Sequence, residues 1–389
     1  MKKVMTKVIA SLMAVLMLTA VLASSALAAT SSNVKQYKTY VCVGDSVASG
    51  FGLPDYNRRG SLVVYGKDIK GSYGRIVAGA VGAKANGKYY PCAYPGFTSA
   101  IFRYVFTDNY TPREWEKNQL ENFSYNVYTP SVLAKERTHI RNAVKAADLV
   151  TLDLGVNDTW YSTISLIYEI AKYGTVIGVE PRQTLAEELA KYGSLETVIR
   201  NALFYLAGFA ENPQLWATFW GWWIDNLATY FLQYQDNYNA IIQGIYDLNP
   251  DVTVVCLASG NSFRALNLTP GQRSGSYKIQ WMNAPIQVDI PLVGTVTLPD
   301  SVHISENPIA NVTGVMYDFF YEPVRKAWEY KKPGQYYYAD VTEYEMIMNH
   351  FSIPMYEFMS MDDSAFNPHA TLAGNQYMAE KILEVLPTR

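Results

Sequence analysis

Short runs of apolar residues recur along the chain with few polar interruptions. A continuous run of this kind is typical of a strand buried on both faces, as in a parallel sheet covered by helices. Stretches with helical spacing of apolar positions lie between several of these runs. The predicted strands are 38–44, 88–96, 148–155, 251–259 and 335–345, and the predicted helices are 72–83, 131–147 and 370–386. This pattern predicts a three-layer α/β fold, in which helices cover both faces of a mostly parallel five-stranded sheet.

Two long segments of the chain are not needed to form such a sheet and its covering helices. Residues 159–232 are predicted to be helical and are rich in aromatic residues. Residues 261–333 combine an alternating apolar–polar pattern at 286–298 with a helical pattern around 312–330. Because neither stretch looks able to bury a core of its own, we predict a single domain over residues 29–389 that carries both as insertions.

The segment 1–28 has the features of a secretory signal peptide. Lysines near the start precede an apolar run from Val8 to Leu22, and the sequence ALA ending at Ala28 is typical of a cleavage site. The alternative is a membrane anchor, but the apolar run is short for a membrane span. We therefore expect cleavage after Ala28, a protein that is secreted or held at the cell surface, and no stable transmembrane segment after cleavage.

Composition and charge indicate a globular protein with a sizeable core and argue against binding to nucleic acids. Hydrophobic residues make up 49% of the chain and charged residues 17%, which provides ample apolar material for a sizeable core. The net charge is −3 for the whole chain and −6 for residues 29–389, because the segment before them carries three lysines and no acidic residue. We expect no nucleic-acid partner, since proteins that bind nucleic acids carry a basic patch.

The three cysteines, Cys42, Cys92 and Cys256, match neither a disulfide framework nor a zinc-binding spacing. Cys42 and Cys256 lie inside predicted strands, where a free cysteine behaves as a small apolar side chain. A disulfide between Cys42 and Cys92 is an alternative if the two strands that carry them are neighbours in the sheet.

Glycines and polar residues follow the carboxyl ends of four predicted strands. The four sequences are Gly44-Asp45-Ser46, Tyr94-Pro95-Gly96, Gly155-Val156-Asn157-Asp158 and Ser259-Gly260-Asn261. In an open α/β sheet, ligands bind beyond these carboxyl ends. A hydroxyl group, a backbone amide at a glycine and a carboxamide therefore meet at one edge of the sheet. Acyl transfer needs this combination, because a serine attacks the carbonyl carbon while hydrogen-bond donors stabilise the oxyanion that forms.

A serine nucleophile needs a base to take its proton, and the chain contains four histidines. His139 lies among charged residues of a predicted helix, which favours an exposed position. His303 and His350 lie in loop-like sequence, which favours structural or surface roles. His369 follows a proline in a loop directly before the last predicted helix, so this loop can return to the sheet edge where Ser46 lies.

In order along the chain, these blocks resemble the four motifs of the SGNH (GDSL-type) hydrolases. GDSVASG at 44–50 is similar to the first block, YPGFTS at 94–99 to the second, LGVND at 154–158 to the third and HATLAGNQYMA at 369–379 to the last. The resemblance implies a flavodoxin-like fold and ester hydrolysis without a metal or organic cofactor. It implies that Ser46 is the nucleophile and His369 the base. It also implies an oxyanion hole formed by the backbone amides of Ser46 and Gly96 and the side chain of Asn157.

One position departs from the family pattern. The family places an aspartate three residues before its histidine, where this chain has Phe366. Asp363 and Asp362 lie six and seven residues before His369, and either one can reach the ring if the intervening residues form a bulged turn. We favour Asp363 over Asp362 as the residue that orients His369. The alternatives are that both aspartates lie in a surface turn, and that a backbone carbonyl orients the histidine of a Ser–His dyad.

The predicted insertion at 159–232 carries a stripe of large apolar side chains at helical spacing. Its members are Trp216, Phe219, Trp220, Trp223, Leu227 and Tyr230. A helix packed on the sheet explains the stripe, and so does a lid or wall of an ester pocket that binds acyl chains or stacks on sugar rings. We predict a secreted serine esterase that acts on a small-molecule, lipid or carbohydrate ester. The alternative is a catalytically impaired protein of the same fold that binds a glycan or cell-wall ligand through this insertion.

Overall fold

The computed structural model describes the central α/β body and several outlying strands. The described residues are 34–57, 66–108, 110, 129–159, 213–258, 266–267, 276–280, 282–290, 294–305, 314, 316–342, 353–354 and 369–388. The predicted signal peptide at 1–28 and residues 160–212 of the first predicted insertion lie outside them. Within these ranges, no helix has both the length and the apolar character needed to cross a membrane.

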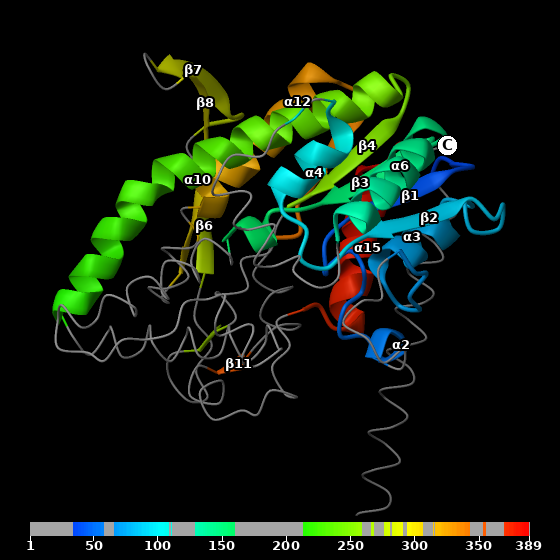
Figure 1. The fold of residues 1–389 in the computed structure, drawn as a ribbon, viewed down its shortest axis with the longest axis horizontal. Coiled ribbons are helices and arrows are strands. Elements are labelled where there is room, and N and C mark those ends of the chain that lie inside the picture. The colour runs from blue at the N-terminus through cyan, green and yellow to red at the C-terminus, as the bar shows by residue number, and fades with distance from the viewer. Residues whose placement is uncertain are drawn as a thin grey trace, which may run out of the picture.

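A five-stranded parallel sheet forms the centre of the described part (Figure 1). Its strands are β1 (Tyr40–Gly44), β2 (Tyr89–Ala93), β3 (Leu149–Asp153), β4 (Thr253–Leu257) and β10 (Tyr336–Ala339). They lie in the order β10-β4-β3-β1-β2, and every neighbouring pair is parallel. This is the strand order of flavodoxin-like sheets, whose ligands bind where the order reverses, between β1 and β3. The predicted fold class is therefore confirmed.

Helices cover both faces of the sheet, so β1, β3 and β4 are buried along their whole length. We call one layer the α3–α15 layer, because α3 (Tyr73–Ala80) and α15 (Leu372–Val385) pack against each other. We call the other the α10–α12 layer. It consists of α4 (Ser99–Phe106), α6 (Pro130–Lys145), α10 (Pro213–Leu248) and α12 (Glu322–Lys331). A short helix, α2 (Pro54–Asn57), follows the first strand.

The remaining strands form three small pairs. Strands β6 (Ser276–Gln280) and β9 (Ser301–Ser305) are antiparallel, as are β7 (Ile286–Ile290) and β8 (Gly294–Leu298), whereas β5 (Leu266–Asn267) and β11 (Ile353–Pro354) are parallel. The alternating pattern at 286–298 therefore forms a β-hairpin, and the prediction that the second insertion is partly β is confirmed.

The ends of both predicted insertions fall within the helical layer. Helix α10 continues without a break through residue 232, the predicted end of the first insertion, and packs against α4 and α6. Helix α12 lies before residue 333, the predicted end of the second insertion. It nevertheless packs against β10 of the central sheet. A π-helical segment, Met316–Tyr321, precedes α12, and Pro323 stands in the first turn of α12, where its missing N–H costs nothing.

All three cysteines are free and buried. Strands β1 and β2 are neighbours, as the disulfide alternative requires, but Cys42 pairs with Pro91 and Cys92 pairs with Val43. Because successive side chains of a strand point to opposite faces, the two sulfur atoms lie on opposite faces of the sheet. The Cys42–Cys92 alternative is therefore wrong.

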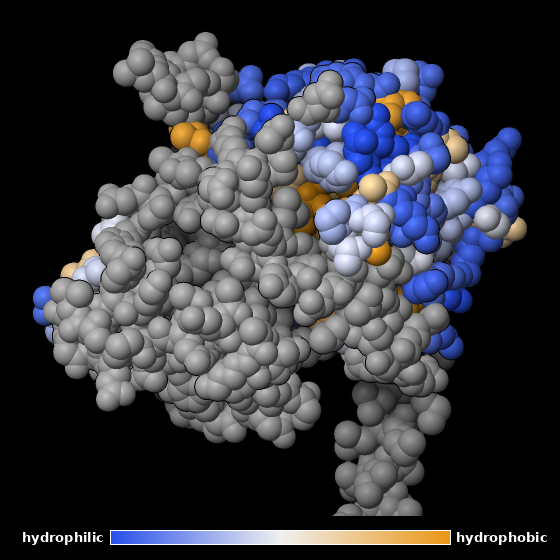
Figure 2. All heavy atoms as spheres, viewed as in Figure 1, coloured by the Kyte–Doolittle hydropathy of each residue, from blue (hydrophilic) through white to orange (hydrophobic). Residues whose placement is uncertain are grey.

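Figure 2 shows one face of the molecule, on which the described side chains are mostly hydrophilic with small apolar spots between them. Five large apolar side chains are exposed among the described residues: Ile279, Ile286, Leu298, Tyr330 and Leu372. Ile286 and Leu298 face each other across the β7–β8 hairpin, and the other three are isolated, as is normal on protein surfaces.

Candidate active site

The turn after β1 presents Ser46 at the carboxyl edge of the sheet. Gly44 ends the strand, and no larger residue fits there, because a Cβ atom would lie 2.7 Å from the carbonyl oxygen of Asp153. The Asp45 carboxylate accepts a hydrogen bond from the Val47 amide at 2.9 Å and closes the turn. Ser46 is only 8% exposed. The turn thus holds the Ser46 side chain in a defined position beside the switch in strand order.

His369 lies in the loop directly before α15 and contacts Ser46. Its Nε2 atom is 2.9 Å from the Ser46 Oγ atom, which is the distance of a hydrogen bond. The fold brings together two residues that are 323 positions apart in the chain. For Ser46 to donate to this nitrogen, the proton of the neutral imidazole must lie on Nδ1. The pair has the geometry of a nucleophile and its general base.

Burial lowers the pKa of His369 from its ordinary value of 6.5 to about 4. The imidazole is therefore neutral at neutral pH, and the lone pair on Nε2 can take the proton of Ser46. A charged imidazole could not act in this way, because both of its nitrogens carry protons.

Two side chains fix the start of α15 and with it the position of His369. The Thr371 hydroxyl caps the helix by accepting a hydrogen bond from the Gly374 amide at 3.3 Å. Asn375 is 1% exposed and donates to the Thr371 carbonyl at 3.0 Å. Its Oδ1 atom accepts a hydrogen bond from the Tyr73 amide, at the start of α3, at 3.0 Å. Asn375 therefore ties together the two helices of the α3–α15 layer.

Asn157 joins the loops after β1, β2 and β3. Gly96 follows β2 in a turn with a left-handed backbone, at φ +87°, and the Phe97 amide closes the turn by donating to the Tyr94 carbonyl at 3.1 Å. The Asn157 Nδ2 atom donates to the Phe97 carbonyl at 2.9 Å and to the Asp45 carboxylate at 3.2 Å. The structure thus brings the predicted site residues of all three loops to one edge of the sheet.

Both hydrogens of the Asn157 amide have acceptors inside the protein. An oxyanion donor must aim an N–H at the substrate, so Asn157 takes that role only if the oxyanion displaces or shares one of these bonds. The bond to Asp45 is the longer of the two, so we expect an oxyanion to displace this bond first. Burial raises the pKa of the Asp45 carboxyl, and the neighbouring Asp153 raises it further.

A second buried carboxyl belongs to Asp153, which ends β3 and pairs with Gly44 in the sheet. Burial raises the pKa of Asp153 to about 7, although the positive charge of Arg325 acts in the opposite direction. Because its pKa lies near 7, the Asp153 carboxyl does not carry a full negative charge at neutral pH. The electrostatic repulsion of a developing oxyanion is correspondingly reduced.

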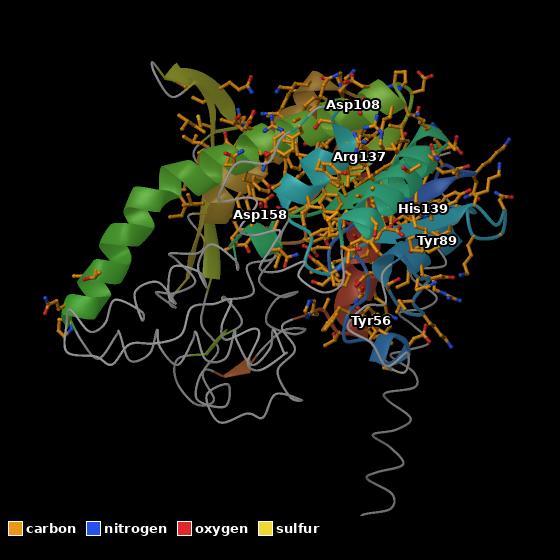
Figure 3. All side chains as sticks on the ribbon, in the orientation of Figure 1. Tyr56, Tyr89, Asp108, Arg137, His139 and Asp158 are labelled. Atoms are coloured by element: carbon orange, nitrogen blue, oxygen red, sulfur yellow. The ribbon has the colours of Figure 1, made fainter. Side chains whose placement is uncertain are left out.

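Asp158 fastens the loop after β3 to the start of α4, and Figure 3 shows it at the end of the sheet beside this helix. Its carboxylate is 7% exposed and accepts hydrogen bonds from the Ser99 amide, at 2.9 Å, and from the Ser99 hydroxyl. A carboxylate at this position satisfies backbone donors and meets the positive end of the helix dipole. Asn237 of α10 donates to the Ser99 hydroxyl at 3.0 Å. Helix α10 therefore contributes to holding the loop that carries Asn157.

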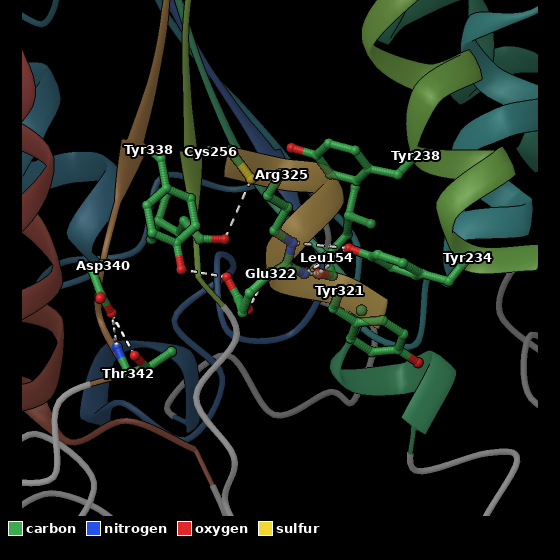
Figure 4. Close-up of polar contacts among 12 residues, drawn as sticks. Leu154, Tyr234, Tyr238, Cys256, Tyr321, Glu322, Arg325, Tyr338, Asp340 and Thr342 are labelled. Carbon is green, nitrogen blue, oxygen red and sulfur yellow. Dashed lines mark hydrogen bonds and ion pairs between the residues drawn. The ribbon is translucent and has the colours of Figure 1, made fainter. Parts of the chain in front are cut away.

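A fully buried arginine supports the same loop from α12 (Figure 4). Arg325 donates to the Leu154 carbonyl, to the Tyr234 hydroxyl at 2.7 Å and to the Glu322 carboxylate at 2.9 Å. Gly155 makes room for it, since a Cβ atom there would lie 2.8 Å from the guanidinium group, and its φ of +115° also favours glycine. The buried charge is thus paired and hydrogen-bonded, as it must be to remain in the core.

Several predicted residues lie outside the described part of the chain. These are Asp362, Asp363 and Phe366, the strand end Ser259-Gly260-Asn261, and the side chains of the aromatic stripe on α10. Of the other histidines, His139 is exposed on α6, as predicted (Figure 3). The loop prediction for His303 is wrong, because this residue lies on strand β9 opposite Lys278, and His350 lies outside the described residues.

The sequence analysis did not identify Asn375 or Arg325 as residues that hold the site. A usable signal existed for Asn375, because asparagine is unfavourable inside a helix unless its side chain has a specific partner. No such signal existed for Arg325, since arginine is almost never fully buried and its partners lie far away in the sequence.

No family model and no curated protein matches this chain. Among solved structures, it is similar to a phospholipase A1 from Streptomyces albidoflavus NA297, with 13% identity, a TM-score of 0.38, and coverage of 88% of this chain and 98% of that one. It is also similar to an extracellular lipase from Streptomyces rimosus, with 12% identity, a TM-score of 0.36, and coverage of 88% of this chain and 97% of that one. Likeness at this level carries no functional argument, so the function must be argued from the site.

Proposed function

We propose that this chain is a secreted serine ester hydrolase of the SGNH type. The observation that carries the proposal is the 2.9 Å contact between Ser46 Oγ and His369 Nε2 at the carboxyl edge of the sheet. Two further features support it. The histidine is held neutral by burial, and the loops that carry Gly96 and Asn157 meet beside the serine turn.

In the proposed reaction, His369 Nε2 takes the proton from Ser46 Oγ as this oxygen bonds to the acyl carbon of the ester. The electron pair of the carbonyl double bond moves to its oxygen, where the amides of Ser46 and Gly96 and the Asn157 side chain stabilise the charge. His369 then gives the proton to the leaving alcohol as the C–O bond breaks. A water molecule, deprotonated by His369, releases the acid and restores Ser46.

The base also requires a group that holds its ring. We propose Asp363 for this role, with Asp362 as the second choice and a Ser–His dyad as the alternative. The mechanism uses residues of this chain throughout and needs no metal or organic cofactor.

The proposed substrates are esters of lipid acyl chains or acetylated glycans. In this proposal the predicted insertion at 159–232 forms a lid or wall of the ester pocket, because it follows Asn157 directly in the sequence. Both substrate classes suit a protein exported through the predicted signal peptide at 1–28.

Turnover of a short-chain 4-nitrophenyl ester by the full chain tests the proposal. We expect Ser46→Ala to lower kcat by about 10⁴-fold or more, as for other serine nucleophiles. Ser131→Ala, an exposed serine at the start of α6, is the matched control and should leave kcat unchanged. Equal activity of Ser46→Ala and the wild type would refute the assignment.

One observation favours a second candidate function. Both Asn157 amide hydrogens are bonded within the protein, as expected if the fold binds a ligand without stabilising an oxyanion. A glycan-binding protein would show no ester turnover, and Ser46→Ala would bind acetylated glycan as well as the wild type. The ester assay therefore separates the two candidates.

A further inference from the structure

Phe51, in the turn that carries Ser46, packs directly against His369. The centroids of the two rings are 4.5 Å apart and the ring planes are tilted by 38°. This separation is at the short end of the range for interacting aromatic rings. One side of the candidate base is therefore in contact with an aromatic ring from the loop of the candidate nucleophile.

The backbone fixes where Phe51 lies. Its amide donates to the Ser46 carbonyl at 3.1 Å, so the residue is tied to the candidate nucleophile itself. Gly50 and Gly52, on either side of it, have φ values of +70° and +83°, a region that favours glycine. Two left-handed residues turn the chain back on itself and direct this single residue toward His369.

The Phe51 ring also packs against Tyr56. Its centroid lies 5.0 Å from that of Tyr56, which is 3% exposed and forms a small apolar cluster with Leu53 and Ile69. Tyr56 belongs to α2 (Figure 3). Phe51 therefore contacts both a buried tyrosine and the imidazole, so a movement of its ring away from His369 would also disturb its packing on Tyr56.

We propose that Phe51 is a positioning residue, whose ring holds the imidazole of His369 in the orientation that keeps Nε2 on Ser46 Oγ. This inference rests on the proposed function. A carboxylate partner of the histidine would fix which nitrogen carries the proton, whereas Phe51 fixes the tilt of the ring.

The ring also favours the charged state through which the reaction passes. When His369 takes the Ser46 proton, the imidazole becomes an imidazolium while the Oγ–acyl bond forms and the negative charge moves to the carbonyl oxygen. The face of an aromatic ring attracts a cation through its quadrupole. An aliphatic side chain of similar size would fill the space but would lack this attraction.

Substitutions at Phe51 separate the effect of the ring from that of volume. In Phe51→Leu, we expect kcat to fall by about 10- to 100-fold with KM within about threefold of wild type, because a misplaced base lowers chemistry rather than binding. Phe51→Tyr keeps the ring and should keep kcat within about threefold of wild type. Phe106→Leu, a buried phenylalanine at the other end of α4, is the matched control and should leave kcat unchanged.

Wild-type kcat in Phe51→Leu would overturn the inference, and so would an equal loss in Phe51→Tyr and Phe51→Leu.

A proton NMR measurement on the wild-type protein tests the same inference without depending on the folding of a variant. In the wild type, the ring current of Phe51 should shift the His369 Hε1 resonance away from its unperturbed position, and an unshifted resonance would also overturn the inference. If the proposed function itself fails, Ser46→Ala keeps full activity, which is a different result from any of these.

Discussion

The α3–α15 layer holds its part of the candidate site through apolar packing and one buried asparagine, whereas the α10–α12 layer uses a buried ion pair and tyrosine hydroxyls. In the first layer, α15 packs in a large apolar cluster, and Asn375 fixes the start of this helix beside His369. In the second, Arg325 and Glu322 hold the strand end that leads to Asn157. Apolar packing loses stability gradually when it is altered, but breaking a buried ion pair leaves an unpaired charge in the core. The two layers should therefore respond differently to substitution.

The largest expected effect on activity concerns the residue that orients His369, which lies just before α15. If Asp363 orients His369, Asp363→Asn should lower kcat by about 10⁴-fold, since an amide favours the wrong imidazole tautomer. Asp362→Asn, one residue away, is the matched control and should lose less than about tenfold. Steady-state kinetics on a nitrophenyl ester measure both variants. The opposite ranking would exchange the two roles, and two mild losses would support a Ser–His dyad.

The largest expected effect on stability lies in the α10–α12 layer. Arg325→Met should lower the free energy of unfolding by about 3–5 kcal/mol, because it leaves the Glu322 carboxylate buried without its cation. The control is Lys381→Met, which breaks another ion pair with three-residue spacing, to Glu384, at a partly exposed position of α15. That change should cost about 1 kcal/mol or less. Urea unfolding followed by circular dichroism measures both.

A double variant sharpens this comparison. Adding Glu322→Gln to Arg325→Met removes the stranded charge and should recover part of the lost stability. If Arg325→Met and Lys381→Met lower the free energy of unfolding by the same amount, the buried ion pair does not distinguish the two layers.

Asn157 lies at the carboxyl edge of the sheet, bonded to the loops after β1 and β2, and its replacement should affect catalysis more than stability. We expect Asn157→Ala to lower kcat by about 10²- to 10³-fold with little change in KM, as for the loss of one oxyanion donor. Asn249→Ala is the matched control, because the Asn249 amide donates to the Val144 and Ala147 carbonyls, away from the site. It should lower stability and leave kcat intact. A rise in KM with unchanged kcat in Asn157→Ala would assign this residue to substrate binding instead.

The pH dependence of kcat/KM is a smaller but specific effect. Neutral His369 is the active form, so activity is present above its pKa and is lost as the pH falls through it. Sequence alone predicts this loss at about pH 6 to 7, the ordinary range of histidine. Because burial lowers the pKa of His369 to about 4, we expect activity to persist well below pH 6. A midpoint of activity at or above 6.5 would show that the imidazole is not desolvated in the free enzyme.

The sheet was predictable because its strands are continuous apolar runs, which parallel strands buried on both faces require. Ser46, Gly96 and Asn157 were predictable from their position, since glycines and polar residues directly after strands meet at one edge. The contact between His369 and Ser46 followed from the chemistry that a serine needs and from the resemblance to a family.

The supporting residues were not predictable, because their roles depend on distant partners. Arg325 lies in a helical pattern that suggests a surface helix, and only the folded chain brings Tyr234 and Leu154 to its guanidinium group. Phe51 similarly gains a role only when the loop before α15 places His369 against its ring. Local propensity carries no information about such contacts.

Covalent labelling of Ser46 tests the central claim most directly. Folded wild-type protein should react with a fluorophosphonate at neutral pH, and peptide mass spectrometry should locate the adduct on Ser46. Ser46→Ala should remain unlabelled, and His369→Ala should react far more slowly because the serine keeps its proton. A folded wild-type protein that is not labelled, or that carries the adduct on another serine, would contradict the account.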